Sequence, residues 1–323
     1  PLLYYIATVT FMIPIFLSDG YPHTAAHLMA VNILLFTPLL FLNFSGINGD
    51  VIFSKLIKIT VWIICLQLLA DLVIKLFNLN LVEAILGGMG NANTFGLHLI
   101  IAALGLRFIY RQQLFSNIIL LMTWGTGSLI CTLVAMLLLL QNIFTNIIKM
   151  KISYVFIFLI ALITLILWGN IIFSRYFFDD FGAVQHTSWK IVGFLSGDAF
   201  EIASVKVRIE WMMNALQLMS ESPFSFIFGH PDFIPFWTGD GFYVTLLVTL
   251  GLPILLLFLI SHIYLLYRNR AIKTSLSQFA SYTLVVYMIF FSTNRILDYW
   301  PSGFVYLLVF SYLCRKNVVQ NKI

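Results

Sequence analysis

Charged residues are scarce in this sequence, and their scarcity excludes most soluble folds. Only 10% of the 323 residues are Asp, Glu, Lys or Arg, whereas 61% are hydrophobic. Globular chains use about 45–50% apolar residues, because a soluble domain cannot bury much more apolar surface than that. Long apolar runs recur along the whole chain. They predict an all-α polytopic membrane protein, since a helix satisfies its own backbone hydrogen bonds in lipid.

Cysteine is also rare, which argues against a disulfide framework or a cysteine metal site. The three cysteines all fall in apolar runs, where packing roles are typical. Asp179 and Asp180 are adjacent, but no further residues supply metal-ligand spacing, so we expect no metal and no cofactor. A cleavable signal pattern is lacking too. The chain begins at Pro1 rather than Met, which leaves open a missing N-terminal piece.

The apolar runs predict about ten transmembrane helices in a single membrane domain, residues 1–323. Several runs are shorter than the ~20 residues of a straight span, and the fifth is the weakest. We place the spans near 2–17, 23–44, 59–77, 95–110, 114–124, 128–146, 153–173, 239–264, 277–293 and 302–314.

The basic residues predict the orientation of these spans. If the N-terminus of this chain and the C-terminus are cytoplasmic, the inside loops and span ends hold most of the 18 basic residues and one acid, Asp50. The positive-inside rule favours this topology. The net charge of +5 is therefore an orientation signal, and no basic patch indicates nucleic acid. The inside basic residues are Lys55, Lys58, Arg107, Arg111, Lys149, Lys151, Arg268, Arg270, Lys273, Arg315, Lys316 and Lys322.

This orientation leaves one long periplasmic loop, residues 174–238. Loops of this length are uncommon unless they are functional or disordered. Disorder is not expected, because Trp189, Trp211 and Trp237 give the loop material for a core of its own. The loop also concentrates acidic residues, arginines and histidines, so we expect it to be partly helical and to carry the active site.

Within the loop, the segment S-V-K-V-R-I-E-W-M-M-N-A-L predicts a helix over 205–219. Ser204 is a candidate N-cap, and Pro223 lies just beyond the end. Lys206 and Glu210 are four residues apart on the polar face, where they can pair. The opposite face carries an apolar stripe, which consists of Val205, Ile209, Met212, Leu216 and Met219.

Arg208 is different, because it falls on the flank of the apolar face beside Trp211. An unpaired guanidinium on such a surface costs several kcal/mol, so it needs an anionic partner. Three alternatives stay open at this point. Arg208 can form a salt bridge to Glu201 or Asp240, extend toward lipid headgroups, or bind a phosphate with its planar fork.

Charged and titratable groups also occur inside the predicted spans. Asp71 lies in the third span with Lys75 four residues on, and an acid at the bilayer centre costs about 2.5–3.5 kcal/mol, so pairing is the preferred interpretation. Histidines such as His98 and His262 favour functional roles at membrane depth. These groups keep a transporter, such as a flippase for lipid-linked oligosaccharide, as an alternative. The absence of internal repeats favours an enzyme.

Four segments carry a resemblance to a known family. They are G-N-A-N-T-F-G (90–96), R-I-E-W-M-M-N-A-L (208–216), P-F-S-F-I-F-G (223–229) and D-G-F-Y-V-T-L-L-V-T-L-G-L-P (240–253). Their order and their sides of the membrane resemble those of the bacterial O-antigen polymerases (Wzy) and the related O-antigen ligases. The first segment is similar to the N-P-N element that precedes an inward-going span in that superfamily.

Two departures from the family pattern bear on function. Many relatives carry a Ser-Arg pair where T-G-S-L-I-C places Leu129 at the position of the arginine. Ligases typically have a histidine at the end of the long loop, ahead of a later glycine. Here Asp240 occupies that position and Gly251 is the later glycine, which favours a polymerase over a ligase.

The resemblance implies a GT-C-like glycosyltransferase of the bacterial inner membrane. Such an enzyme passes a growing polysaccharide from its undecaprenyl-diphosphate carrier to a new lipid-linked repeat unit at the periplasmic face. An O-antigen ligase and a flippase are the alternatives, and a separate chain-length regulator is a further partner that the sequence leaves open.

The resemblance also implies roles for residues. It implies a catalytic set of Arg208, Asp240 and His230, and a substrate-binding set of Arg175, Arg295, Trp211, Asn91 and Asn93. Arg208 would neutralise the leaving diphosphate, and a carboxylate or imidazole would take the proton of the sugar hydroxyl. Structural alternatives remain: Arg175 at the membrane interface, Arg295 paired with Asp298, and Asp240 as the N-cap of the next helix.

Overall fold

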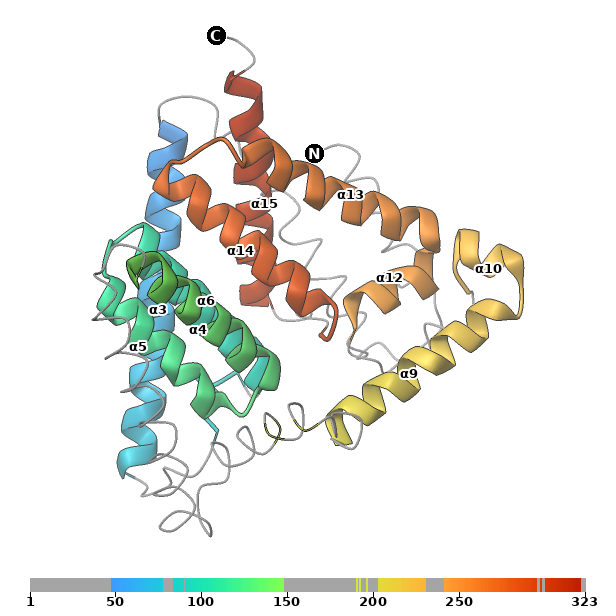
Figure 1. The fold of residues 1–323 in the computed structure, drawn as a ribbon, viewed down its shortest axis with the longest axis horizontal. Helices are drawn as coiled ribbons and strands as arrows, with labels where there is room; N and C mark the ends of the chain where they lie inside the picture. Colours follow the sequence, from blue (N-terminus) through green and yellow to red (C-terminus); the bar gives the residue numbers. More distant parts are fainter. Residues whose placement is uncertain are drawn as a thin grey trace. The chain divides into compact units, whose positions relative to one another are not determined.

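The computed structural model of the protein describes residues 48–77, 84–89, 91–147, 190, 192, 196, 203–230, 241–294, 297 and 300–320. These residues form ten α-helices, one 3-10 helix and no strand, which confirms the predicted all-α class for this part of the chain (Figure 1). The predicted spans near 2–17, 23–44 and 153–173 lie outside the described residues.

The chain divides into two compact units. One, the C-terminal unit, comprises residues 1–61, 104–112 and 198–323; the other, the central unit, comprises 62–103 and 113–197. The helices are α3 (Asn48–Phe77), α4 (Ala92–Phe108), α5 (Gln113–Met122), η2 (Thr123–Thr126), α6 (Leu129–Ile147), α9 (Ala203–Ser220), α10 (Pro223–Phe228), α12 (Phe242–Leu250), α13 (Leu252–Asn269), α14 (Ser275–Phe291) and α15 (Trp300–Gln320).

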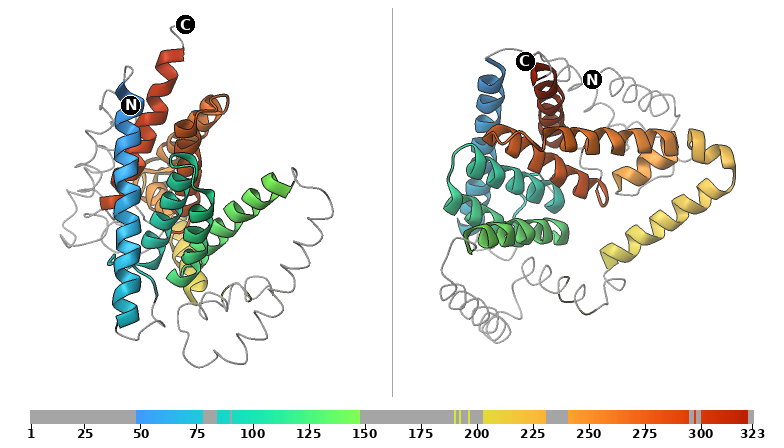
Figure 2. Two further views of the ribbon diagram at one scale, coloured as in Figure 1. Left: turned by 90° about the vertical axis from the view of Figure 1, so that its left-hand side faces the viewer. Right: turned by 45° about the horizontal axis from the view of Figure 1, so that its top comes forward.

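Two of these helices are long and apolar enough to cross a membrane. They are residues Gly49–Phe77 of α3 and Leu252–Asn269, the whole of α13. Large apolar side chains along both helices are exposed, among them Trp62 of α3 and Ile260 of α13. A helix in the core of a soluble protein buries such side chains. The exposed apolar surface, together with the length of α3 visible in Figure 2, favours association with a membrane.

The predicted span 239–264 is wrong as a single helix, because the chain turns at Gly251. This residue has φ 81°, a conformation that glycine adopts readily and other residues avoid. Pro253 follows in the first turn of α13, where its missing N–H costs nothing. The helix α12 therefore doubles back along the first half of α13, with the rings of Phe242 and Phe258 5.4 Å apart (Figure 1).

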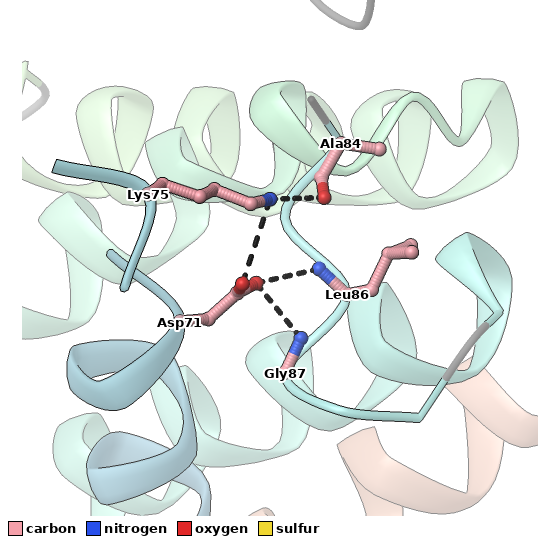
Figure 3. Close-up of polar contacts among 5 residues, drawn as sticks. All are labelled: Asp71, Lys75, Ala84, Leu86 and Gly87. Carbon is pink, nitrogen blue, oxygen red and sulfur yellow. Dashed lines mark hydrogen bonds and ion pairs between the residues drawn. The ribbon is translucent and has the colours of Figure 1, made fainter. Parts of the chain in front are cut away.

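The central unit confirms the pairing of Asp71 with Lys75. The Lys75 Nζ lies 3.5 Å from Asp71 Oδ1 and also donates to the carbonyl of Ala84. The other carboxylate oxygen of Asp71 accepts hydrogen bonds from the backbone N–H groups of Leu86 (2.7 Å) and Gly87 (2.9 Å) (Figure 3). The pair thus fastens the end of α3 to the chain that leads into α4, which is a structural role.

In the C-terminal unit, two hydrogen bonds join α13 to α15. His262 of α13 bonds to the Tyr306 hydroxyl of α15 over 2.7 Å, and further along Asn269 donates to the Leu313 carbonyl over 3.5 Å. The other ring nitrogen of His262 lies 2.7 Å from the Phe258 carbonyl. Both nitrogens are therefore used inside the protein, and the functional role expected for this histidine gives way to a structural one.

One end of the C-terminal unit collects basic residues. Asp50, near the start of α3, accepts a hydrogen bond from Tyr312, near the end of α15 (2.9 Å). Tyr110, just after α4, contacts Lys58 of α3, and Arg268 and Arg270 stand at the end of α13. The opposite end of α13, at Gly251, adjoins α10. The basic residues Arg268 and Arg270 are thus separated by the length of α13 from α10, one of the two helices of the long loop.

The turn at Gly251 can be tested with alanine. A Cβ at Gly251 would overlap the Ile227 carbonyl, whereas a Cβ at Gly88, which has a similar φ of 76°, would meet nothing within 4 Å. We expect Gly251→Ala to lower the free energy of unfolding by about 1–3 kcal/mol more than Gly88→Ala does, because backbone atoms cannot yield as side chains do. Unfolding of both purified variants in mixed detergent micelles measures the difference, and equal losses would contradict the contact.

Candidate functional site

The helix predicted in the long loop is present as α9, with its packed face shifted from the expected one. It begins at Ala203, so Ser204 lies inside the first turn and the N-cap assignment was wrong. Ala215 and Met219 are fully buried against Val248 of α12. Of the predicted stripe, Met212 and Leu216 are 41% and 40% exposed. The packed face is therefore centred on Ala215.

This shift brings Arg208 onto the packed side of α9. Arg208 and Trp211 are half-buried, and they share a face with Ala215 because residues three and four apart stack along a helix. The Arg208 Nε donates a hydrogen bond of 3.2 Å to the carbonyl of Thr293, just beyond the end of α14. Carbonyls at the end of a helix carry partial negative charge, which favours a cation there. The predicted partners Glu201 and Asp240 lie outside the described residues.

Two of the four family-like segments touch through their backbones. A Cβ at Gly229 would overlap the carbonyl of Thr249, and a Cβ at Gly251 would overlap the carbonyl of Ile227. Both glycines also have positive φ, 83° and 81°. Ser222 caps the start of α10 by accepting from the Phe224 N–H over 3.2 Å. The segments 223–229 and 240–253 therefore form one packed unit around these glycines.

The contact places His230 beside an acid that the sequence analysis did not assign. The backbone N–H of His230 donates to the Val248 carbonyl over 2.7 Å, and its Nε2 lies 3.6 Å from the Glu221 carboxylate. Glu221 follows the last residue of α9, and α10 separates it from His230. A carboxylate next to an imidazole fixes the orientation of the ring. A sequence signal did exist, because the two residues stand on either side of a short segment that starts with the helix-initiating pair Ser222–Pro223 and ends at Gly229.

In the central unit, Asn91 serves as the cap of α4. Its side-chain oxygen accepts hydrogen bonds from the backbone N–H groups of Asn93 (2.9 Å) and Thr94 (3.1 Å). The side-chain oxygen of Asn93 accepts from the Ser128 hydroxyl, immediately before α6. A Cβ at Gly96 would overlap Cys131. The segments G-N-A-N-T-F-G and T-G-S-L-I-C are thus packed together, with Leu129 at the start of α6.

The remaining predicted site residues are distributed as follows. Arg208, Trp211 and His230 belong to the C-terminal unit, and Asn91 and Asn93 to the central unit. Arg175, Asp240 and Arg295 lie outside the described residues. The N-cap of α12 is Gly241, not the Asp240 that the sequence suggested as a cap. Among the residues that the structure describes, no group of three His, Cys, Asp or Glu side chains could hold a metal ion.

No family model matches this chain, and no curated protein matches its sequence.

The role of Asn91 can be tested by changing its acceptor. We expect Asn91→Ala to lower the free energy of unfolding by about 1 kcal/mol, and Asn91→Asp to change it by only a few tenths, because Asp caps a helix as well as Asn does. Detergent unfolding of the purified variants measures both. Equal destabilisation by the two substitutions would contradict the cap, and it would mean that the amide nitrogen of Asn91 is the group that stabilises the fold.

Proposed function

We propose that this protein is an O-antigen polymerase of the bacterial inner membrane. It joins undecaprenyl-diphosphate-linked repeat units of O-antigen, or of a related surface polysaccharide, at the periplasmic face. The observation that carries the proposal is the packing of the three loop segments: R-I-E-W-M-M-N-A-L on α9 lies on α12, and P-F-S-F-I-F-G of α10 is locked to the glycine turn between α12 and α13. Segments that resemble the family in sequence are thereby neighbours in space.

The chemistry requires that the charge of a leaving diphosphate be neutralised. Arg208 supplies a guanidinium on the packed side of α9, held through its Nε by a neutral backbone carbonyl. A hydrogen bond of this kind orients the side chain. The planar fork of arginine suits phosphate oxygens, and charge stabilisation of this type lowers the barrier most when the group is already positioned. Arg175 and Arg295 are proposed helpers.

The reaction also needs a base for the attacking sugar hydroxyl. His230 fits this role, because Glu221 lies beside its Nε2 and the glycine contact holds its backbone. Asp240 is the second proposed base, because a carboxylate can take the proton of a sugar hydroxyl. Trp211, on the same side of α9 as Arg208, is proposed to contact the sugar or the lipid-linked diphosphate.

The arrangement of helix ends supports the proposed orientation. The basic residues at the end of α13, Arg268 and Arg270, lie at the opposite end of this helix from α10, which adjoins Gly251. With the basic end in the cytoplasm, as the positive-inside rule favours, both termini of this chain are cytoplasmic and the loop helices are periplasmic. The protein is then a multi-pass protein that binds lipid-linked oligosaccharide and polysaccharide, with no cofactor.

The Asp71–Lys75 pair argues against the transporter alternative. Its charges are matched to each other and to three backbone groups of the chain before α4. A charge that lines a transport path has to exchange its partners during the cycle, whereas this pair closes a structural link. The acid in the third span therefore needs no transport function to explain it.

A pair of cations on α9 tests the proposed role of Arg208. We expect Arg208→Ala to reduce polymer formation by about 100-fold or more, and Arg208→Lys to reduce it strongly, because lysine lacks the bidentate fork. Lys206→Ala is the matched control, since Lys206 is exposed two residues away on the polar face. Polymer is measured on lipopolysaccharide gels at equal membrane levels of each variant. Similar losses at both positions would contradict the role given to the packed face.

A deletion strain distinguishes polymerase from ligase. Without a polymerase, the cell still attaches one repeat unit to its surface lipid, because the ligase is intact. Without a ligase or a flippase, nothing is attached. We expect a band of core plus one repeat on a lipopolysaccharide gel, and the ladder to return when the gene is restored. A band of bare core, or an unchanged ladder, would overturn the polymerase assignment.

A further inference from the structure

The short helix α10 has its polar and apolar side chains reversed relative to a soluble helix. Its one buried residue is Ser225, whereas Phe224 and Phe228 are each 70% exposed and Ile227 is 49% exposed. A soluble surface rarely gathers large apolar side chains in this way unless they contact a partner. The exposed face of α10, formed by these three residues, is called the α10 apolar face below.

The α10 apolar face is presented rigidly. Ser222 caps the first turn, and the Gly229 N–H closes the last turn on the Ser225 carbonyl over 2.9 Å. The backbone contacts of Gly229 with Thr249 and of Gly251 with Ile227 then lock the helix to the α12–α13 turn. Ser225 is the buried residue of α10, so this side of the helix is the one that faces the protein. The exposure is therefore built into the fold.

The α10 apolar face continues onto α13. Ile227 and Phe228 adjoin Gly251, the residue before α13, and the first turns of α13 expose Leu252 and Leu256. In Figure 1, α10 stands at the end of α13 that α12 also reaches. If α13 crosses the membrane, its exposed apolar side chains face lipid. The adjoining side chains of the α10 apolar face then contact the same layer of lipid.

The opposite end of α13 indicates how deep α10 lies. There Arg268 bonds to the Tyr264 hydroxyl over 3.3 Å, and Arg270 stacks 4.0 Å from the ring of Tyr267. Tyrosines with neighbouring arginines are typical of a membrane–water interface. An 18-residue helix rises about 27 Å, close to the ~30 Å thickness of the hydrocarbon core. With the Tyr–Arg end at one interface, α10 lies at the other.

From these observations we infer that α10 is an interfacial anchor that inserts Phe224, Ile227 and Phe228 into the acyl chains of the outer leaflet. The inference rests on the membrane crossing of α13 that the proposed function includes. Its occupant is lipid hydrocarbon, since the face carries no charged side chain and joins the exposed surface of a membrane-length helix. Glu221 and His230 flank α10, so the anchor holds this pair at headgroup depth, where the diphosphate of a lipid-linked substrate lies.

Spin labelling of the full chain in liposomes tests the anchor. Cys65, Cys131 and Cys314 are first replaced by alanine, and single cysteines are then introduced by Phe224→Cys and Phe228→Cys. Asn214→Cys is the matched control, because Asn214 is exposed on the adjoining helix α9. The vesicles consist of phosphatidylethanolamine and phosphatidylglycerol. Collision rates are measured with molecular oxygen, which concentrates in lipid, and with a water-soluble nickel chelate.

Labels at 224 and 228 should show an oxygen-to-nickel collision ratio at least about fivefold above that of the label at 214, as expected for side chains in an acyl boundary. Ratios equal to that of the control would mean that the face is in water, and protection from both reagents would mean that protein covers it. Either result overturns the anchor. The labels report location alone, so the outcome is independent of whether the deletion strain supports the polymerase.

Discussion

The positions of α9 and α10, the two helices of the long loop, depend on a close contact between two backbone segments. Gly229, at the end of α10, lies against the Thr249 carbonyl, and Gly251, at the start of α13, lies against the Ile227 carbonyl. Neither position has room for a Cβ, and both have a φ that other residues avoid. Because backbone atoms cannot rotate away as side chains do, this contact sets the angle between α10 and the α12–α13 turn.

This backbone contact positions residues of the proposed site on two sides, toward α9 and toward α12. Toward α9, the chain passes from α10 through Ser222 and Glu221, so fixing α10 also fixes the acid that lies beside His230. Toward α12, Val248 packs against Ala215 and Met219, and its carbonyl accepts a hydrogen bond from the His230 N–H. Arg208, two turns before Ala215 on the same face, is carried to the end of α14 by this packing.

Sequence reasoning predicted the helices better than their faces and breaks. The helix over 205–219 and the pairing of Asp71 with Lys75 were confirmed, as was the all-α class for the residues that the structure describes. The single helix over 239–264 was wrong, because hydropathy is the same on both sides of Gly251 and shows no turn. The packed face of α9 was shifted, since Met212 and Leu216 are as apolar as Met219 and the pattern alone does not tell which of them meets α12.

The sequence by itself determined the apolar composition, the periodicity of α9, the clustering of basic residues near helix ends and the segments that resemble a polymerase. These are local properties, set by a residue and its neighbours within about two helical turns. The tertiary structure alone decided that Gly229 and Gly251 meet carbonyls of other segments, that Glu221 lies beside His230 and that Arg208 bonds to Thr293. Each of these contacts joins residues that are far apart in the sequence or that meet only through the packing of other helices. Local hydropathy does not predict which residues come together in this way.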